Sequence, residues 1–312
     1  MKTITFVIPC YNERENIPAL YAAVNEIMAQ KLPQYKYDFI FADNASPDGS
    51  AQVLKTMAAA DKRVRVIINN RNFGVDRSCM NAFLAARGDA AIILACDLQN
   101  PPALIPDFVK LWESGAKVVW AQRVGSSENI LMKAARGLYY KIIKTLSDVK
   151  QYEYTTGWGL YDAGVIAKVS ALRDPAPLMR NIIPDLGYEP ALVPYCQPRR
   201  ARGKSSYNFW RYFDTALSSL INTSKVPLKI CIFFGFFTAL LSGLAGAYYF
   251  AYKLLYWDSF SPGIAPLVVG IFFLSSVQIF FLGIAGEYIL AVLSRQSFTS
   301  YVIEKERINF DD

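Results

Sequence analysis

The sequence predicts an α/β domain built on a parallel sheet, followed by two transmembrane helices. Over the first 120 residues, apolar runs of strand length alternate with segments of helical period, which is typical of a parallel sheet wrapped by helices. Two uncharged runs of 23 residues each, 230–252 and 264–286, are long enough to cross a hydrocarbon core of about 30 Å. The start of the chain meets Pro9 and charged residues too early to supply the apolar core of a signal peptide.

Five strands are expected in the first part of the chain, with helices between them. The strands are expected over residues 3–9, 37–43, 64–70, 90–97 and 117–123. The helices are expected over residues 15–30, from about residue 48, over residues 75–87 and over residues 103–114. In the first helix, Ile17, Leu20, Val24 and Ile27 share one face, which is the spacing of a helix packed on a sheet.

Polar turns follow four of the predicted strands. They lie at residues 9–13, 43–49, 69–74 and 96–102. Because ligands of such sheets bind beyond the carboxyl ends of the strands, we expect these turns to face one shared cleft. The next region, residues 125–195, is expected to be mixed, with a helix near residues 128–146. No GxGxxG follows the first strand and no GxxxxGK[ST] occurs, which disfavours a dinucleotide-binding domain and a P-loop NTPase.

Basic residues beside the two apolar runs predict their orientation. Those before the first run are Arg199, Arg200, Arg202, Lys204, Arg211, Lys225 and Lys229, and those after the second are Arg295, Lys305 and Arg307. By the positive-inside rule both flanks are cytoplasmic. The predicted organisation is a cytoplasmic domain over 1–206, a juxtamembrane amphipathic helix over 207–228, a two-helix transmembrane domain over 229–294 and a cytoplasmic tail over 295–312.

Charge and side-chain inventory exclude several classes of function. The net charge is +7, but the basic residues crowd beside the membrane among Tyr207, Trp210 and Tyr212. Membrane lipids or a lipid phosphate are therefore the expected partners, and nucleic acid is not. The five cysteines are scattered without a CxxC, which is typical of free thiols in a reducing compartment. The absence of histidine excludes a histidine general base and most zinc sites.

Four segments together resemble a known family. They are FVIPCYNERENI, NRNFG, CDLQNPPALIPDF and GIAGEYI, and they occur together with the two apolar runs. In this combination the chain resembles the membrane-bound family 2 glycosyltransferases that charge polyprenyl phosphate with a sugar, such as bactoprenol-phosphate glucosyltransferases and dolichol-phosphate mannose synthases. The resemblance covers nearly the whole chain. It implies a GT-A type domain, a nucleotide-sugar donor, a divalent metal and a lipid-phosphate acceptor.

The resemblance assigns the donor mainly to the first three turns. Glu13 is expected to accept a hydrogen bond from ribose or base, with Tyr11 as a packing face, and Asp43 stands where the family has an acid that contacts the base. Asn44 replaces a second acid of the commoner pattern. The full donor set is Pro9, Tyr11, Asn12, Glu13, Asp43, Asn44, Asn72, Gly74 and Asp97. The alternative role of Asn12 or Glu13 is to cap the first helix.

The expected metal site departs from the family pattern. The family typically has DxDxQ, and the matching positions are Ala95, Asp97 and Gln99, so one carboxylate is missing. Mg²⁺ often binds through one or two carboxylates together with substrate phosphates and water. Asp97 and Gln99, with the donor diphosphate, are therefore the expected site for Mg²⁺ or Mn²⁺. The alternative is that Asp97 caps the helix after Pro102.

The residues expected to contact the acceptor also depart from the family pattern. A GDFRL-like segment, whose acid is proposed as a base in related enzymes, corresponds to TGWGL, with Gly157 at the acid's position and Gly159 at the arginine's. A lipid monophosphate has a second pKa near 6, so positioning it is harder than deprotonating it. The residues expected to bind it are Arg123, Arg200, Arg202 and Lys204, and the catalytic set is Asp97, Arg123 and Arg200. The alternative for the basic loop is a topology signal alone.

These expectations combine into one function and leave two alternatives open. The function is inverting transfer of a sugar from a nucleotide sugar, UDP-linked by the resemblance, to undecaprenyl phosphate at the cytoplasmic face of the inner membrane, for surface glycan synthesis or modification. A catalytically silent, membrane-anchored binding or scaffold protein would account for the substitutions at Ala95, Gly157 and Gly159. A processive polysaccharide synthase is disfavoured because no QxxRW segment occurs. A homo-oligomer is expected because two spans make a small membrane domain.

Overall fold

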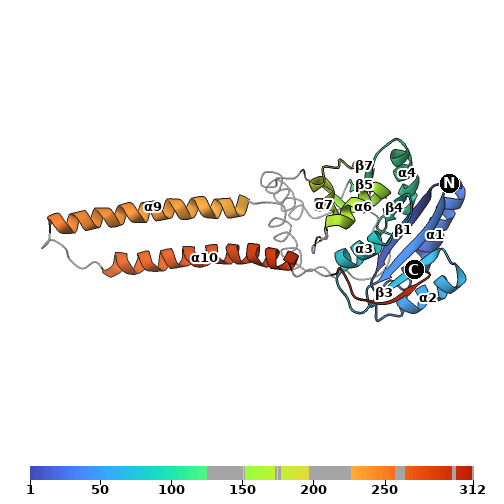
Figure 1. The fold of residues 1–312 in the computed structure, drawn as a ribbon, viewed down its shortest axis with the longest axis horizontal. Coiled ribbons are helices and arrows are strands. Elements are labelled where there is room, and N and C mark those ends of the chain that lie inside the picture. The colour runs from blue at the N-terminus through green and yellow to red at the C-terminus, as the bar shows by residue number, and fades with distance from the viewer. Residues whose placement is uncertain are drawn as a thin grey trace. The chain divides into compact units, whose positions relative to one another are not determined.

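The computed structural model describes residues 1–124, 150, 152–172, 174, 177–196, 226–256, 264–296 and 300–310. The chain divides into two compact units (Figure 1). The first contains Met1–Tyr140, Val149–Tyr207 and Ser297–Asp312, and the second contains Lys141–Asp148 and Asn208–Gln296. The first unit carries the sheet, and the second carries two long apolar helices.

An eight-stranded sheet forms the centre of the first unit. Its strands are β1 (Thr3–Cys10), β2 (Lys36–Asp43), β3 (Val64–Asn69), β4 (Ala90–Ile93), β5 (Val118–Arg123), β6 (Thr155–Asp162), β7 (Ala191–Tyr195) and β8 (Glu304–Ile308). Their order across the sheet is β7-β5-β6-β4-β1-β2-β3-β8. All five strands predicted in the first part of the chain are confirmed, although β4 ends before the predicted limit because the chain leaves the sheet there to form the turn at Asp97.

The sheet is mixed, which corrects the prediction of a parallel sheet. Strand β1 is parallel to β2 and β4, β2 is parallel to β3, and β5 is parallel to β7. Strand β6 runs antiparallel to β4 and β5, and β8 runs antiparallel to β3. The strand-and-helix alternation predicts only the first five strands. The antiparallel pair at β3 arises because the C-terminal segment returns to cover an otherwise open sheet edge.

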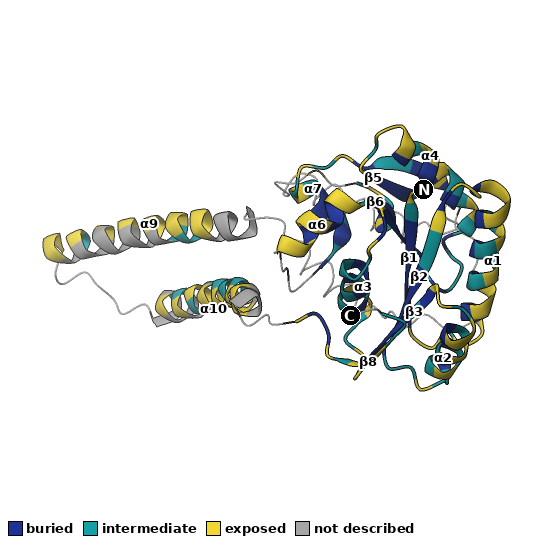
Figure 2. Cartoon of the chain, turned by 45° about the vertical axis from the view of Figure 1, so that its right-hand side comes forward, coloured by how far each residue is buried: buried dark blue, intermediate teal, exposed yellow. Residues whose placement is uncertain are grey.

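Helices cover both faces of the sheet (Figure 2). One face carries α1 (Asn16–Lys31), α2 (Ser50–Ala60) and α4 (Ile105–Glu113), the last preceded by a short 3-10 helix at Pro102–Leu104. The other face carries α3 (Val75–Leu84), α6 (Ala163–Leu172) and α7 (Met179–Asp185). Successive residues of β1 serve opposite faces, since Phe6 packs with the first group of helices and Val7 with the second. The four helices predicted before residue 120 are therefore confirmed.

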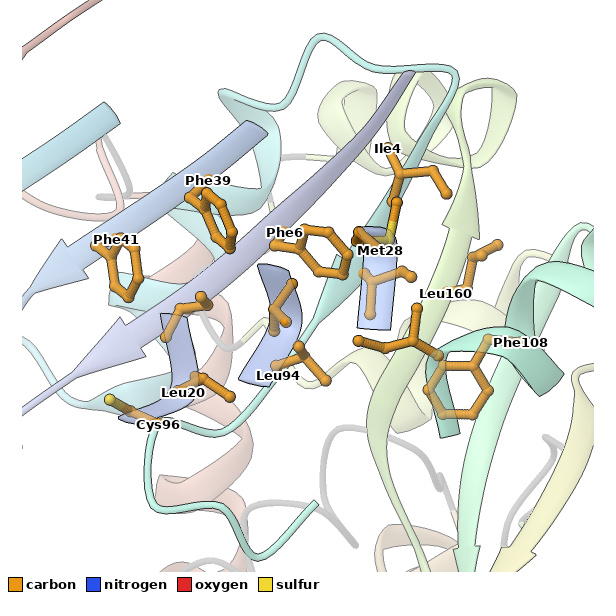
Figure 3. Packing of buried hydrophobic residues seen from close by; sticks show 14 of the residues in the cluster. Ile4, Phe6, Leu20, Met28, Phe39, Phe41, Leu94, Cys96, Phe108 and Leu160 are labelled. Carbon is orange, nitrogen blue, oxygen red and sulfur yellow. The ribbon is translucent and has the colours of Figure 1, made fainter. Parts of the chain in front are cut away.

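Aromatic side chains fill the core between β1, β2 and α1 (Figure 3). The ring of Phe6 stacks on Phe39 at a centroid distance of 5.5 Å, and Phe39 stacks on Phe41 at 5.9 Å. Met28 of α1 closes this layer and is fully buried, whereas Ile27, predicted on the buried face, is only partly buried. This packing holds β1 and β2 side by side, so it also fixes the positions of their carboxyl ends.

The C-terminal segment joins the sheet, although the sequence predicts a cytoplasmic tail over 295–312 and shows no strand signal there. Strand β8 pairs with β3 along the sheet edge. Lys55 of α2 forms an ion pair with Glu306 at 2.5 Å. Asn309 Nδ2 donates to the carbonyls of Ala58 at 2.7 Å and Val64 at 2.9 Å. The end of the chain is therefore part of the folded first unit.

The second unit contains α9 (Val226–Leu255) and α10 (Ile264–Gln296). Large apolar side chains on both helices are exposed, as Phe233 and Leu282 are at 73% and 70% (Figure 2). The rings of Phe234 and Phe281 approach to 5.8 Å, which brings the two helices into contact. By length and composition, one stretch among the described residues is suited to cross a membrane, Phe273–Leu290 within α10.

Two predicted helices lie outside the described residues. One is the helix near residues 128–146, and the other is the juxtamembrane helix of 207–228, of which only the last three residues are described, as the start of α9. The basic loop of residues 197–208 is also outside them. These three expectations stay predictions.

Candidate functional site

The turns after β1, β2 and β4 lie at one edge of the sheet, because these strands are neighbours in the order β4-β1-β2 and are parallel. Each turn contains a non-glycine residue with a left-handed φ: Asn12 at 58°, Ala45 at 59° and Leu98 at 59°. Such conformations cost about 1–3 kcal/mol each and persist only where the surroundings impose them. Their clustering marks this edge as the candidate site.

The first turn is held against the second by three backbone N–H groups. The bonds run from Asn12 N to Ser46 Oγ at 3.0 Å, from Glu13 N to Ser50 Oγ at 3.1 Å and from Arg14 N to Asp48 Oδ2 at 3.1 Å. Glu15 directly precedes α1 and makes no side-chain cap bond, whereas the carbonyl of Glu13 accepts the N–H groups of Asn16 and Ile17 at 2.9 and 3.0 Å, so the capping alternative for Glu13 stays open. The Glu13 side chain accepts from Asn16 Nδ2 at 2.6 Å, which orients its carboxylate within the first turn.

Asp43 ends β2 as a buried carboxylate, only 1% exposed. Its Oδ2 accepts the Ser46 N–H at 3.1 Å. Its Oδ1 is buried and has no hydrogen-bond partner among the residues that the structure describes. Burial raises the pKa of Asp43, and the Ser46 hydrogen bonds offset part of that rise. An unsatisfied buried acceptor costs about 1–3 kcal/mol, so this oxygen is suited to receive an N–H or O–H from a ligand.

Asn44 connects the end of β2 to the loop after β3. Its Oδ1 accepts from Asn69 Nδ2 at 3.0 Å and from Phe73 N at 3.0 Å. Its Nδ2 donates to Asn72 Oδ1 at 2.9 Å, and the same Asn72 oxygen accepts from Gly74 N at 2.8 Å. The predicted donor residues Asn44 and Asn72 therefore hold the loop of residues 69–74 in place, and direct contact between their side chains and a donor stays a prediction.

Asp97 lies in the turn after β4 and is half-buried. Its Oδ1 accepts the Gln99 N–H at 3.1 Å, which fixes the carboxylate relative to the turn. The following 3-10 helix has Pro101 as its N-cap without a side-chain cap bond, and the capping alternative for Asp97 stays a prediction. Asp97 and Gln99 are thus together in one turn, as predicted, while Ala95 supplies no ligand.

Arg123 and Tyr195 are paired across the parallel strands β5 and β7. Directly paired residues of parallel strands point to the same face of the sheet. Burial raises the pKa of Tyr195, the Arg123 guanidinium lowers it, and the Asp97 carboxylate raises it. Arg123 therefore lies beside Tyr195, and its meeting with Asp97 in one site stays a prediction. Tyr195 was not predicted, because its only signal in the sequence is its place at the end of a short apolar run.

Gly157 and Gly159 lie within β6 and cannot be replaced by residues with side chains. Gly157 has a φ of +81°, and a Cβ there would lie 2.9 Å from the Cβ of Met179. Gly159 has a φ of +152°, and a Cβ there would lie 2.0 Å from the carbonyl oxygen of Val119. The acid and the arginine that related enzymes carry at these two positions are therefore incompatible with this local backbone.

Two buried thiols lie at the same sheet edge. Cys10 ends β1 and Cys96 precedes Asp97, and they are 2% and 3% exposed. Burial raises the pKa of Cys10 well above its ordinary value, and the neighbouring Cys96 raises it further. Protonated thiols of this kind are inert, so we assign them a packing role. Free thiols are confirmed for the four cysteines that the structure describes, Cys10, Cys79, Cys96 and Cys196.

The predicted acceptor residues Arg200, Arg202 and Lys204 lie outside the described residues. Their part in binding a phosphate, and the alternative of a topology signal alone, stay predictions. Arg123 is the one member of the predicted acceptor set that the structure describes, and it ends β5 on the same side of the sheet as the turns.

Comparison with known proteins identifies the fold and family. The model of the family described as glycosyl transferase family 2 matches residues 5–172, which is more than half of the chain. The chain belongs to glycosyl transferase family 2. This match and the sheet with its two helical layers confirm the predicted GT-A type α/β domain.

Relatives of this family 2 enzyme match it over almost its whole length. The bactoprenol glucosyl transferase of Shigella phage SfV is 29% identical over 97% of this chain and 99% of its own. The SfII prophage-derived bactoprenol glucosyl transferase of Shigella flexneri is 30% identical over 97% of each chain. A prophage bactoprenol glucosyl transferase homolog of Escherichia coli K12 is 28% identical over 92% and 93%. The predicted place among the polyprenyl-phosphate glycosyltransferases is thereby confirmed.

Solved structures resemble this family 2 chain more distantly. A mannosyltransferase of Pyrobaculum calidifontis in complex with GDP-Man and Mn²⁺ covers 94% of this chain and 87% of its own, at 16% identity and a TM-score of 0.46. The glucosyl-3-phosphoglycerate synthase of Mycobacterium tuberculosis, in complex with Mn²⁺, UDP and phosphoglyceric acid, covers 70% and 76%, at 16% identity and a TM-score of 0.48.

Restoring the missing acid should damage this protein. We expect Gly157→Asp to destabilise the fold by at least about 2 kcal/mol, because the new Cβ meets Met179 and an aspartate must adopt a positive φ. Gly187→Ala is the matched control, since Gly187 also has a positive φ, +79°, but a Cβ there meets nothing within 4 Å. It should cost only about 1–2 kcal/mol. Thermal unfolding of the full chain in detergent checks both, and a stable, more active Gly157→Asp variant would contradict this reading.

Asp43 should make stability depend on pH. Its pKa is raised in the folded state, so the ionised carboxyl is disfavoured there, and stability falls as the pH rises through the interval between its unfolded and folded pKa values. Asp43→Asn removes this loss. In the absence of ligand the variant should melt a few degrees above the wild type at pH 8, and the difference should shrink towards pH 4. The exposed Asp107→Asn is the control, and a lower melting temperature of Asp43→Asn at pH 8 would refute the prediction.

Proposed function

We propose that this family 2 enzyme transfers a sugar, with inversion at the anomeric carbon, from a nucleotide sugar to polyprenyl phosphate, undecaprenyl phosphate in bacteria. The observation that carries the donor side is Asp43 Oδ1, a buried acceptor without a partner among the described residues. A ring N–H of a base such as uracil would satisfy this oxygen, and we take the UDP-linked donor from the family resemblance. The acceptor is proposed from the full-length relatives that are named bactoprenol glucosyl transferases.

The donor would extend from Asp43 along the edge of the sheet. Tyr11, 43% exposed in the first turn, offers a ring face to the base, and Asn12 and Glu13 offer polar groups to the ribose. Pro9 is buried in β1 and anchors the start of this turn. Gly74 precedes α3, and the position of its missing Cβ has nothing within 4 Å. This open space at a helix N-terminus suits the negatively charged diphosphate.

Asp97 and Gln99 would hold a divalent metal jointly with the donor diphosphate. No group of three or more His, Cys, Asp or Glu side chains gathers among the described residues, so that part of the protein forms no complete carboxylate site. A half-buried Asp97 whose Oδ1 is oriented by Gln99 N fits Mg²⁺ or Mn²⁺ that takes its other ligands from phosphate and water. When bound, such an ion supplies charge neutralisation for the departing diphosphate.

The reaction would be a single displacement on the sugar. A phosphate oxygen of the lipid attacks the anomeric carbon, the bond from that carbon to the diphosphate oxygen breaks, and the nucleoside diphosphate leaves with the bonding electrons. The lipid phosphate is mostly dianionic at neutral pH, so it attacks without a protein base, which agrees with glycine at position 157. Arg123 would bind the phosphate beside Asp97, together with Arg200, Arg202 and Lys204.

The membrane placement is part of the same proposal. The run of residues 230–252 lies within α9, Phe273–Leu290 lies within α10, and both helices expose large apolar side chains. We propose that both span the inner membrane with the sheet domain in the cytoplasm, so that the enzyme meets the phosphate of its lipid acceptor at the cytoplasmic face. The lipid-linked sugar would then serve surface glycan synthesis or modification. Helices that expose this much apolar surface also suit assembly into a homo-oligomer.

A transfer assay tests the proposal. Detergent-solubilised full-length protein receives UDP-, GDP- or TDP-linked radiolabelled sugars and undecaprenyl phosphate, with Mg²⁺, Mn²⁺ or EDTA. We expect labelled lipid with one donor class and none with EDTA. Asp97→Ala should lower kcat by roughly 100-fold or more, and Asp43→Asn should weaken donor binding roughly 10- to 100-fold, the effect of one hydrogen bond to a charged group. Asp107→Asn, on the exposed first turn of α4, should leave both unchanged.

The opposite result would select the silent alternative. The substitutions at Ala95, Gly157 and Gly159 are the observation that favours it. A folded protein that binds a nucleotide in the presence of Mn²⁺ but labels no lipid with any donor would show that the enzyme-like fold serves binding alone.

A further inference from the structure

The first half of the C-terminal segment contacts the loop after β3 and helix α3. Three hydrogen bonds join them: Asn70 N to Ile303 O at 2.9 Å, Arg77 Nη2 to Ser300 O at 2.7 Å and Asn81 Nδ2 to Glu304 Oε1 at 2.5 Å. These partners are more than 220 residues apart in the sequence. The contacts are therefore tertiary and must form after both parts of the chain are in place.

Burial adds to these hydrogen bonds. Tyr301 and Val302 are 8% and 5% exposed, and they belong to the same buried cluster as Ile67 of β3 and Met80 and Phe83 of α3. Residues 300–304 therefore pack under α3 as well as along β3. The second half of the segment behaves differently, since Glu306 and Asn309 reach α2 and the start of β3, away from the loop.

Residues 300–304 contact the loop that carries predicted donor residues directly at Asn70, and they contact helix α3, which follows that loop, at Arg77 and Asn81. Asn69, at the end of β3, is 2% exposed, and its Nδ2 donates to Asn44 Oδ1 and Ser78 Oγ, both at 3.0 Å. The β3–β8 pairing is irregular between Ile68 and Asn69. The irregularity lies where the C-terminal segment meets the Asn44 network. Asn44 in turn follows Asp43, whose Oδ1 is the open acceptor.

We propose that residues 300–304 form a C-terminal clamp that positions the donor-binding loop of residues 69–74. The role of this loop in donor binding rests on the proposed function. The physical content of the proposal is that the clamp adds to the hydrogen bonds of Asn44, so that the loop loses order when the clamp is detached. Asn81 and Glu304 are positioning residues, which act on the nucleotide through the loop. The clamp follows α10 in the chain.

Point variants in the full-length protein separate an effect of the clamp on nucleotide binding from a general loss of stability. We expect Asn81→Ala and Glu304→Ala each to raise the dissociation constant of UDP or GDP, measured calorimetrically with Mn²⁺, about fivefold to tenfold. The double variant should bind no more weakly than the weaker single one, because both remove the same bond. The KM for the donor should rise, while kcat should stay within twofold of the wild-type value. Lys55→Met is the matched control, since it removes the ion pair of β8 to α2 and should change nucleotide binding less than twofold.

Hydrogen exchange provides a readout that does not depend on nucleotide. In Glu304→Ala, amides of residues 69–74 should lose at least tenfold protection while those of β1 keep theirs. Unchanged exchange in the loop, or variants that only melt earlier while binding nucleotide as the wild type does, would overturn the clamp. If the wild type binds no nucleotide but Glu304→Ala still loses protection in the loop, the clamp is supported and the proposed function is overturned.

Discussion

The side-chain amide of Asn44 is the interaction on which the rest of the site depends. It ties the end of β2 to Asn69 at the end of β3 and to the loop that contains Asn72 and Phe73. Asn44 is 3% exposed, so these hydrogen bonds form away from water, where leaving one unmade is costly. Asp43 can therefore stay buried with one open oxygen, because the backbone around it is held by its neighbour. An uncharged amide suits this task better than the second acid of the commoner pattern, which could accept hydrogen bonds but not donate to Asn72.

Glycine at positions 157 and 159 limits which catalytic groups the protein can supply. The tight approach of β6 to Val119 and Met179 leaves no volume for a side chain, so no acid can be presented from this strand at either position. A phosphate nucleophile that is already dianionic does not need one. What the site must supply is positive charge for the phosphate and orientation for the diphosphate. Arg123, which is paired with Tyr195 at the end of β5, is the residue we propose for the first need among the described residues.

Much of the fold could be predicted from the sequence because buried parallel strands appear as short, continuous apolar runs. Strand β6 escaped prediction because its glycines interrupt the pattern, and β8 because EKERI is charged and resembles a solvated tail. Its pairing with β3 is a tertiary contact that no local pattern reports. The meeting of the turns that carry Asp43 and Asp97 at one sheet edge could also be predicted, since parallel strands place their carboxyl ends together, whereas the binding roles of these residues stay predictions. The positioning role of Asn44 and the presence of Tyr195 depend on side-chain packing, which periodicity does not encode.

If the lipid phosphate attacks without a protein base, the pH dependence of kcat/KM for the acceptor should reflect the ionisation of that phosphate alone. We expect a single rising limb with an apparent pKa near 6, that of the phosphate itself, followed by a plateau. The limb should move to higher pH when a polyprenyl phosphonate, whose second ionisation is weaker, replaces the phosphate. A limb that stays at the same pH with both acceptors would belong to a group of the protein and would show that the enzyme supplies a base.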